Sequence, residues 1–291
     1  MNLSKTSFGH FNLYTIETGD IKLDGGAMFG VVPKTLWSRG IAANENNRIS
    51  MTMRCLLVES TKTGKLYLID NGVGSKFNEK LMDIYEIDFS EKSLLSSLNF
   101  HGFSPIQITD IIFTHLHFDH CGGTTFYDEN GEPAFTFPNA KYHINKRHWK
   151  TAIQPNAREK ASFLRENIEP LKSSLNVHLV DDNHEFESGL STYMANGHTI
   201  GQQLPLITDG DRTLLFVADL LPTHVHVPLP WVMGYDMYPA QTLLEKEQFL
   251  QLASDNDWFI FLEHDVECEI ITLSFDGKRA KVNQTLSLND I

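Results

Sequence analysis

The chain has few cysteines, and their scarcity excludes one common way of stabilising a protein. Only three occur in 291 residues, Cys55, Cys121 and Cys268, and they lie far apart. A disulfide-stapled domain would carry an even number of cysteines at closer spacing. We therefore expect a reduced protein held together by a buried core. Cys121 directly follows a histidine-rich segment and is expected to fill space beside it as a small buried side chain.

Basic residues and long apolar runs are also scarce. Lysine and arginine total 24 against 37 acidic residues, which gives a formal net charge of −13 at pH 7. A nucleic-acid partner is not expected, because binding phosphates requires a surface rich in lysine and arginine. No stretch approaches the ~18 apolar residues of a membrane span, and the first ten residues contain no apolar leader. We expect a soluble, cytoplasmic protein with no membrane partner.

The apolar residues that are present suffice for a large α/β core. Hydrophobic residues make up 41% of the chain, and short apolar runs alternate with segments of helical spacing. Strands are expected at 51–59, 65–70, 108–113, 141–144, 177–180, 192–195, 213–218 and 258–262, with a further pair around 276–277. Helices are expected at 90–101, from 146, at 157–173 and at 239–254, after a hairpin-rich opening over 10–33 with its turn at Gly25-Gly26. With no repeat or linker, residues 1–291 are predicted to form one domain of two packed sheets with helices outside.

Residues 114–123 carry the strongest chemical signal and read Thr-His-Leu-His-Phe-Asp-His-Cys-Gly-Gly. Four side chains able to bind a metal ion fall within six positions: His115, His117, Asp119 and His120. An apolar run leads directly into them, so the pattern predicts a strand that ends in a ligand-bearing loop. Imidazole and carboxylate groups suit zinc and similar first-row ions. One histidine alone would be interpreted as structural, but several such groups without partners would be costly to bury.

Three residues farther along the chain share one context. His198, Asp219 and His264 each follow a short apolar strand where the chain turns into a loop. Together with the first cluster they make five histidines and two aspartates, enough to hold two metal ions. Each ion would keep one position open for water or substrate, as a catalytic site requires. The spacing therefore predicts a dinuclear catalytic centre.

The order of these motifs resembles the metallo-β-lactamase superfamily. The motifs are H-x-H-x-D-H, then Gly-His-Thr, Ala-Asp-Leu and Glu-His-Asp, within a match over about residues 10–285. The resemblance implies an α/β fold, a four-layer αββα sandwich with two metal ions between its sheets. It implies His115, His117 and His198 on the first ion, Asp119, His120 and His264 on the second, and Asp219 as the bridge. The implied ions are zinc, with cobalt, manganese or iron as alternatives.

Two further segments, residues 24–37 and 231–239, resemble the YtnP-type quorum-quenching N-acyl homoserine lactonases, to which methyl parathion hydrolases are related. The implied activity is opening of the lactone ring by a metal-bound hydroxide, with Asp119 moving the proton to the leaving group. The implied partner is a small lactone or ester, and members of the family often form homodimers. Asp70 either contacts a ligand histidine from behind or serves only as a turn residue at the end of a strand.

Two positions depart from the family pattern. Members often carry a second histidine in Gly-His-Thr-Pro-Gly-His, where this chain has Gln202. Several lactonases place a tyrosine three residues after the bridging aspartate, where this chain has Pro222. His224 or Tyr235 would then contact the substrate carbonyl, or the contact is absent.

Apolar and aromatic residues in loop-like segments predict the wall of a substrate pocket. The alternative is that these residues cover the core or form a subunit interface. The residues assigned to the pocket are Met28, Phe29, Trp37, His224, Trp231, Met233, Tyr235 and Tyr238. His143 and His148 have no partner pattern and are expected to be structural.

The same ligands serve several reactions, so the sequence leaves alternatives open. An organophosphate or aryl-ester hydrolase, or another hydrolase of this fold, would use the same seven residues. An iron-dependent oxidoreductase of the fold is a more remote alternative, because flavodiiron proteins carry a flavin domain for which this chain has no room. A protein that uses the metal only for stability is not expected to keep the complete ligand set.

Overall fold

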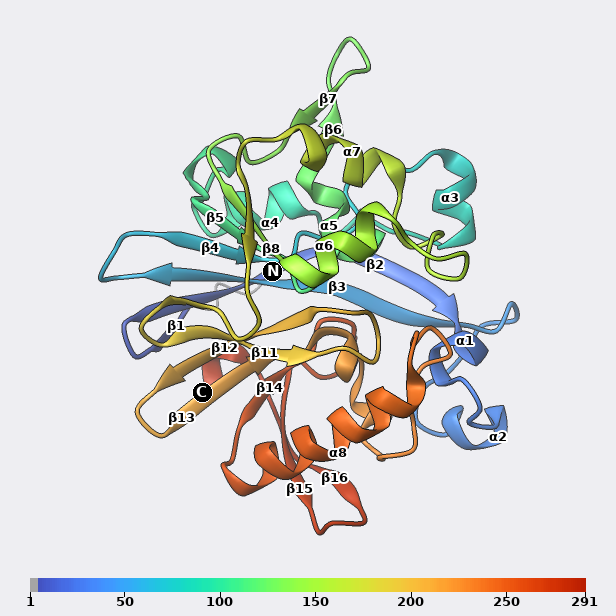
Figure 1. Ribbon diagram of the computed structural model, residues 1–291. Helices are drawn as coiled ribbons and strands as arrows, with labels where there is room; N and C mark the ends of the chain where they lie inside the picture. Colours follow the sequence, from blue (N-terminus) through green and yellow to red (C-terminus); the bar gives the residue numbers. More distant parts are fainter. Residues whose placement is uncertain (1–4) are drawn as a thin grey trace.

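The computed structural model describes residues 5–291 and contains two facing sheets (Figure 1). Residues 1–4, the start of the expected domain and of the N-terminal segment, lie outside the described residues. In the first sheet the strand order is β1-β2-β3-β4-β5-β8-β9. Its strands are β1 (Lys5–Phe8), β2 (Phe11–Asp24), β3 (Arg48–Ser60), β4 (Leu66–Ile69), β5 (Asp110–Ile112), β8 (Lys141–Asn145) and β9 (Val177–Val180). From β4 onward the neighbouring strands run parallel.

The second sheet follows the sequence order from β10 to β16. Its strands are β10 (Glu185–Glu187), β11 (Leu190–Ala195), β12 (Gln202–Asp209), β13 (Arg212–Phe216), β14 (Phe259–Phe261), β15 (Ile270–Phe275) and β16 (Ala280–Leu286). Neighbours are antiparallel except β13 and β14, which are parallel. A separate hairpin of β6 (Thr125–Tyr127) and β7 (Pro133–Phe135) projects from the first half of the molecule.

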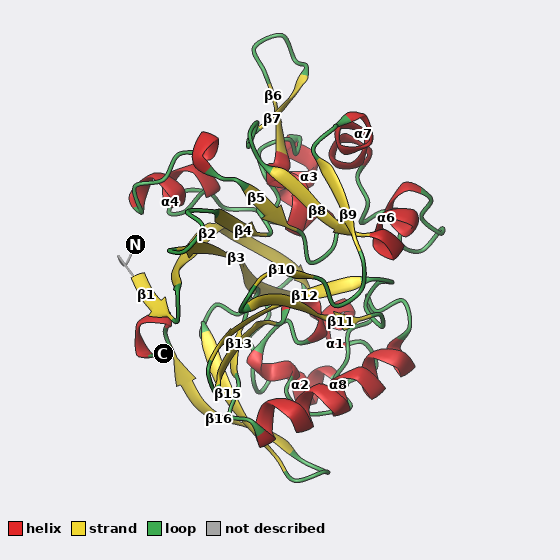
Figure 2. Ribbon diagram, turned by 60° about the vertical axis from the view of Figure 1, so that its left-hand side comes forward, coloured by secondary structure: helices red, strands yellow, loops and turns green. Residues whose placement is uncertain are grey.

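Helices cover the outer faces of both sheets, which confirms the expected four-layer α/β sandwich (Figure 2). The longest of them, α8 (Pro239–Asp255), packs on β15 of the second sheet. The others are α1 (Gly25–Phe29), α2 (Lys34–Trp37), α3 (Glu79–Ile84), α4 (Leu94–Phe100), α5 (Phe118–Cys121), α6 (Lys146–Ile153) and α7 (Arg165–Ser173). Among residues 5–291, no helix is both long enough and apolar enough to cross a membrane.

Strand β3 shows how the sequence builds two cores at once. Side chains alternate between the faces of a strand, and Leu56 and Val58 belong to the core between the sheets. Cys55 and Leu57 belong to the core beneath α4 and its neighbours. Every one of these four side chains is fully buried. A continuous apolar run is therefore required, as expected for a strand covered on both sides.

Most expected elements are present, and two expectations were wrong. Gly25-Gly26 begins α1 instead of forming a turn, because the Asp24 side chain caps that helix by accepting from the Ala27 amide. The expected helix over 157–173 begins only at Arg165. Before it, the Asn156 side chain accepts from the Arg158 and Glu159 amides and holds a turn.

Candidate metal centre

All seven predicted ligands lie where strands of the two sheets end. His115 and His117 follow β5, and Asp119 and His120 lie on α5 directly after them. From the second sheet, His198 follows β11, while Asp219 and His264 follow the parallel neighbours β13 and β14. The carboxyl ends of parallel strands lie at one edge of a sheet, so these last two residues are brought together by the topology.

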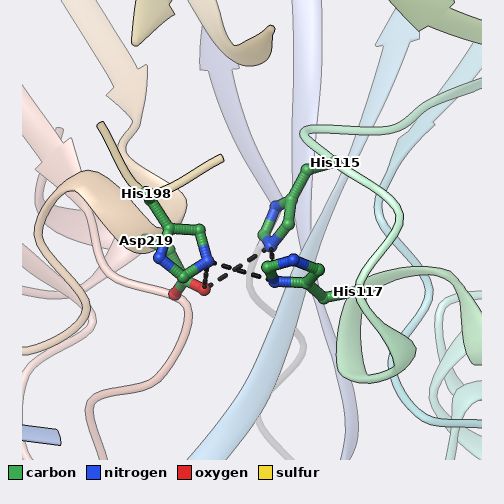
Figure 3. Close-up of side chains that lie close together, drawn as sticks. All are labelled: His115, His117, His198 and Asp219. Atoms are coloured by element: carbon green, nitrogen blue, oxygen red, sulfur yellow. Dashed lines mark hydrogen bonds and ion pairs between the residues drawn. The ribbon is translucent and has the colours of Figure 1, made fainter. Parts of the chain in front are cut away.

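The first group joins three histidines to one carboxylate (Figure 3). One ligand atom from each of His115, His117, His198 and Asp219 lies within 4.8 Å of all the others. His117 Nδ1 lies 3.0 Å from His115 Nε2 and 3.1 Å from His198 Nε2. Asp219 Oδ2 lies 3.0 Å from His198 Nε2. Four donor atoms therefore converge on one small volume.

The second group adjoins the first through Asp219. Asp119, His120 and His264 form a buried set whose ligand atoms also lie within 4.8 Å of one another. Asp219 Oδ1 lies 3.1 Å from His264 Nε2, and its Oδ2 lies 3.4 Å from His120 Nε2. The carboxylate of Asp219 therefore contacts histidines of both groups.

Each of the five histidines turns one ring nitrogen inward and the other toward a protein acceptor. The outward partners are Thr114 Oγ1 for His115, Glu159 for His117, Asp70 for His120, Asp236 for His198 and the Thr52 carbonyl for His264. Metal-binding histidines show this arrangement, since the outer bond fixes ring orientation and tautomer. The donor set fits two divalent ions, because converging imidazole nitrogens and carboxylates are the ligands that zinc prefers.

Asp70 contacts a histidine of the cluster, which is one of the two interpretations that the sequence left open. Its Oδ2 lies 3.0 Å from His120 Nδ1 and accepts from Thr114 Oγ1 at 2.6 Å, while Oδ1 accepts from the Thr114 amide at 2.8 Å. Glu159 and Asp236 were not anticipated, because they lie in loops with no strand before them. No sequence signal distinguishes them from other acidic loop residues.

The groups around Asp219 control its charge. Burial alone would raise the pKa of Asp219, but His198, His120 and His264 hold it well below its usual range. Burial would likewise lower the pKa of His198, yet the carboxylates of Asp219 and Asp236 raise it to about 10. Asp219 is thus kept ionised between the two groups, where it attracts positive charge.

Two glycines allow the ligand segment to pack closely on the loop after β4. A Cβ atom on Gly122 would lie 2.1 Å from the Val73 carbonyl oxygen, and one on Gly123 would lie 2.2 Å from the Asn71 carbonyl oxygen. Any larger residue at either position would push the two backbones apart. Gly-Gly at the end of the histidine motif is therefore a packing requirement of the centre.

A cavity of about 190 Å³ opens above the two groups. Its floor consists of His117, Asp119, His198, Asp219 and His264. Its wall is mainly apolar and consists of Leu23, Met28, Met51, Tyr85, Phe118, Ala161, Met233, Tyr235 and Met237, with Arg158 and Glu159 on one side. Three of the eight residues assigned to the pocket from the sequence, Met28, Met233 and Tyr235, thus belong to the wall.

The other five assigned residues lie elsewhere. Phe29 and Trp37 are buried and stacked with ring centroids 5.1 Å apart, and Trp231 packs edge-on against Phe29. Tyr238 is 46% exposed at the start of α8. His224 donates from its Nδ1 to Asp265 at 2.5 Å.

Three residues expected to be structural are placed accordingly. His143 Nε2 lies 2.7 Å from Asp110 Oδ1 in the neighbouring strand. His148 Nε2 accepts from the Leu116 amide at 2.8 Å and so supports the ligand loop from below. Cys121 is fully buried, and burial raises the pKa of its thiol to about 12. None of the three needs a chemical role to explain its position.

A sequence model of the metallo-β-lactamase superfamily matches residues 54–264. The chain belongs to this superfamily. The matched region begins in β3 and ends at His264, so it includes all seven residues of the two groups. Together with the buried histidine–aspartate groups, the family makes this protein a metal-dependent hydrolase of the metallo-β-lactamase fold.

Proteins similar to this one include lactonases. An N-acyl homoserine lactonase from Bacillus cereus is 26% identical over 238 residues, which cover 77% of this chain and 85% of that protein. A probable metal-dependent hydrolase from Staphylococcus aureus is 28% identical, with a TM-score of 0.85 over 97% of this chain and 100% of its own. AidC, a dizinc quorum-quenching lactonase in complex with a product, is 24% identical, with a TM-score of 0.77 over 98% of this chain and 97% of its own. The last likeness is one of fold.

Proposed function

We propose that this protein hydrolyses the lactone ring of N-acyl homoserine lactones, using two divalent metal ions, most simply zinc. The observation that carries the proposal is Asp219, whose carboxylate contacts histidines of both groups at the floor of a cavity with an apolar wall. The B. cereus lactonase, similar over most of its length, supports the substrate class.

The ligand assignment follows the two groups. His115, His117 and His198 would hold one ion, Asp119, His120 and His264 the other, and Asp219 would bridge them. Two such ions, when bound, supply Lewis-acid chemistry that lowers the pKa of water and polarises a carbonyl. The outer hydrogen bonds to Asp70, Glu159 and Asp236 would keep the rings in place during turnover.

Asp119 is the residue proposed to move the proton. Its carboxylate belongs to the cavity floor, and its Oδ2 lies 3.8 Å from His120 Nε2. In this position it can accept a proton from the attacking water and deliver it to the alkoxide that leaves when the ring opens. Because it borders the cavity, its carboxylate faces the space in which a substrate would bind.

Pro222 stands where several lactonases carry a tyrosine that contacts the substrate carbonyl. Of the two residues that could make this contact here, Tyr235 is better placed than His224. It belongs to the cavity wall, whereas the His224 imidazole is engaged by Asp265. Burial raises the pKa of Tyr235 to about 12, so its hydroxyl stays protonated at neutral pH. A protonated phenol can donate a hydrogen bond to the substrate carbonyl.

The apolar wall is proposed to hold the acyl chain. Met28, Met51, Met233 and Met237 contribute four flexible thioether side chains to it. Methionine adapts to differently shaped apolar ligands, so we expect several chain lengths to be accepted.

The test is a substrate panel on zinc-loaded and cobalt-loaded protein, with proton release as the readout. N-acyl homoserine lactones of several chain lengths would be compared with a phosphotriester, an aryl ester and a β-lactam. Lactone turnover well above the other substrates supports the proposal. Faster cleavage of the phosphotriester or aryl ester would agree with the proposed metal centre but refute the lactone as the substrate.

A further inference from the structure

Glu263 places a carboxylate in the interior without a hydrogen-bond donor. The side chain follows β14, directly before His264, and is fully buried. Neither carboxylate oxygen accepts a hydrogen bond from any residue of the described chain. Its Oε2 lies 3.1 Å from His120 Nδ1. A carboxylate that is buried without a hydrogen-bond donor is costly for a fold.

The contrast with Asp70 shows what Glu263 lacks. Both carboxylates approach His120 Nδ1, which carries only one proton to donate. Asp70 accepts that hydrogen bond and two more from Thr114. Glu263 accepts none, so its charge is balanced only electrostatically, by the imidazole of His120 and then by that of His264.

The neighbouring cation does not supply the missing partner. Arg54 Nη1 donates to the carbonyl oxygens of Leu262, Asp265 and Cys268, and its Nε donates to Glu17. On the other side lies the thiol of Cys55, whose pKa is raised well above its usual value, first by burial and then by Glu263. Arg54 therefore gives Glu263 no hydrogen bond, and the groups that offset its negative charge are the imidazoles of His120 and His264.

We propose that Glu263 is a positioning residue that stores negative charge for the second metal ion. This inference rests on the ligand assignment of the proposed function. The His120 ring presents Nε2 to the metal group and Nδ1 to Glu263, so a cation on the far side of the ring offsets the buried charge. Glu263 thus destabilises the metal-free protein and strengthens ion binding at Asp119, His120 and His264.

Glu263 is expected to lower the stability of the metal-free protein and to raise the affinity for the second ion. A residue that served only for packing would raise stability instead, so the two roles can be distinguished. Glu263→Gln keeps the shape and removes the charge. We expect its metal-free melting temperature in chelator to rise by a few degrees, the scale of a single substitution in a large domain. Binding of the second zinc equivalent, measured by competition with a chromophoric chelator, should weaken about 10- to 100-fold. The first equivalent should be unchanged.

Two matched variants serve as controls. Asp70→Asn loses bonds to Thr114 and should lower the metal-free melting temperature, opposite to Glu263→Gln. Glu159→Gln acts on His117 and should weaken the first group instead. Glu263→Met removes charge and polarity together, and its metal-free protein should also be more stable than wild type.

The proposal is overturned if both Glu263 variants lower the metal-free melting temperature, or if both zinc equivalents bind as in wild type. Neither readout uses a lactone. A wild-type protein that binds two ions but opens no lactone would refute the substrate assignment alone. A wild-type protein that binds fewer than two ions would refute the metal assignment before any variant is compared.

Discussion

The floor and the wall of the cavity are built by different means. Every floor histidine is held at its outer ring nitrogen by a protein acceptor, and the floor residues are at most 7% exposed. The wall consists of side chains such as Met28 and Met233, which are held by apolar packing in the cluster that also contains Trp37. Hydrogen bonds fix direction, whereas apolar contacts tolerate changes of shape. We therefore expect catalytic geometry to depend on the floor and substrate selection to depend on the wall.

Removing a proposed metal ligand should cause the largest effect. Asp219→Asn, or His120→Ala, should lower lactone turnover by roughly 10³-fold or more, because several kcal/mol of metal-derived stabilisation would be lost. Turnover is measured by proton release, and folding by circular dichroism. Asp209→Asn, in β12 of the same sheet, is the matched control. Full activity in either variant would show that the dinuclear mechanism is wrong.

Weakening the support of one floor histidine should cause an intermediate effect. Asp236→Asn removes a carboxylate that lies 3.1 Å from His198 Nδ1. Zinc affinity of the first group should fall about 10- to 100-fold, with melting temperature in chelator as the check on folding. Glu267→Gln, an exposed carboxylate, should change neither quantity. If Asp236→Asn bound zinc as tightly as wild type, the contact between Asp236 and His198 would not contribute to metal binding.

Changing the wall should alter selection and leave the floor intact. Met233→Ala opens space in the cavity. The substitution should weaken the binding of long-chain substrates about tenfold more than that of short ones, since one methylene group in an apolar pocket contributes about 1–3 kcal/mol. Trp231 packs behind the wall, against Phe29. Trp231→Ala should therefore lower the stability of the protein and reduce activity equally for substrates of all chain lengths. KM values across a chain-length series separate the two. If the change in KM of Trp231→Ala depended on chain length, Trp231 would contact the acyl chain after all.

The smallest effect is expected at the cavity mouth. Arg158 Nη2 donates to the carbonyl oxygens of Gly234 and Asp236, across the opening from one wall segment to the other. Arg158→Lys should raise KM only a few-fold, because an exposed interaction contributes about 1 kcal/mol or less. Lys160→Ala, an exposed neighbour, is the control. If kcat fell by a larger factor than KM rose, Arg158 would take part in the catalytic step and not only in shaping the cavity mouth.

The sequence predicted the floor far better than the wall, for a physical reason. Strand ends and the H-x-H-x-D-H spacing are local signals, so the ligands from His115 to His264 can be grouped by reading along the chain. Asp236 and Glu159 contact histidines far away in the chain, and no local pattern marks them. Trp37 illustrates the same limit: an aromatic residue in a loop-like segment can face a pocket or fill the core behind it, and here it is buried.

One buried cation has a consequence for how this protein can change over time. Lys246 of α8 donates to the carbonyl oxygens of His226, Pro228 and Trp231, and Arg158 holds the following residues by their carbonyl oxygens as well. Both cations contact main chain, which is the same whatever the side chains are. Residues along this loop can therefore be exchanged while its path is preserved. New substrate preferences can evolve, or be engineered, one side chain at a time without rebuilding the metal centre.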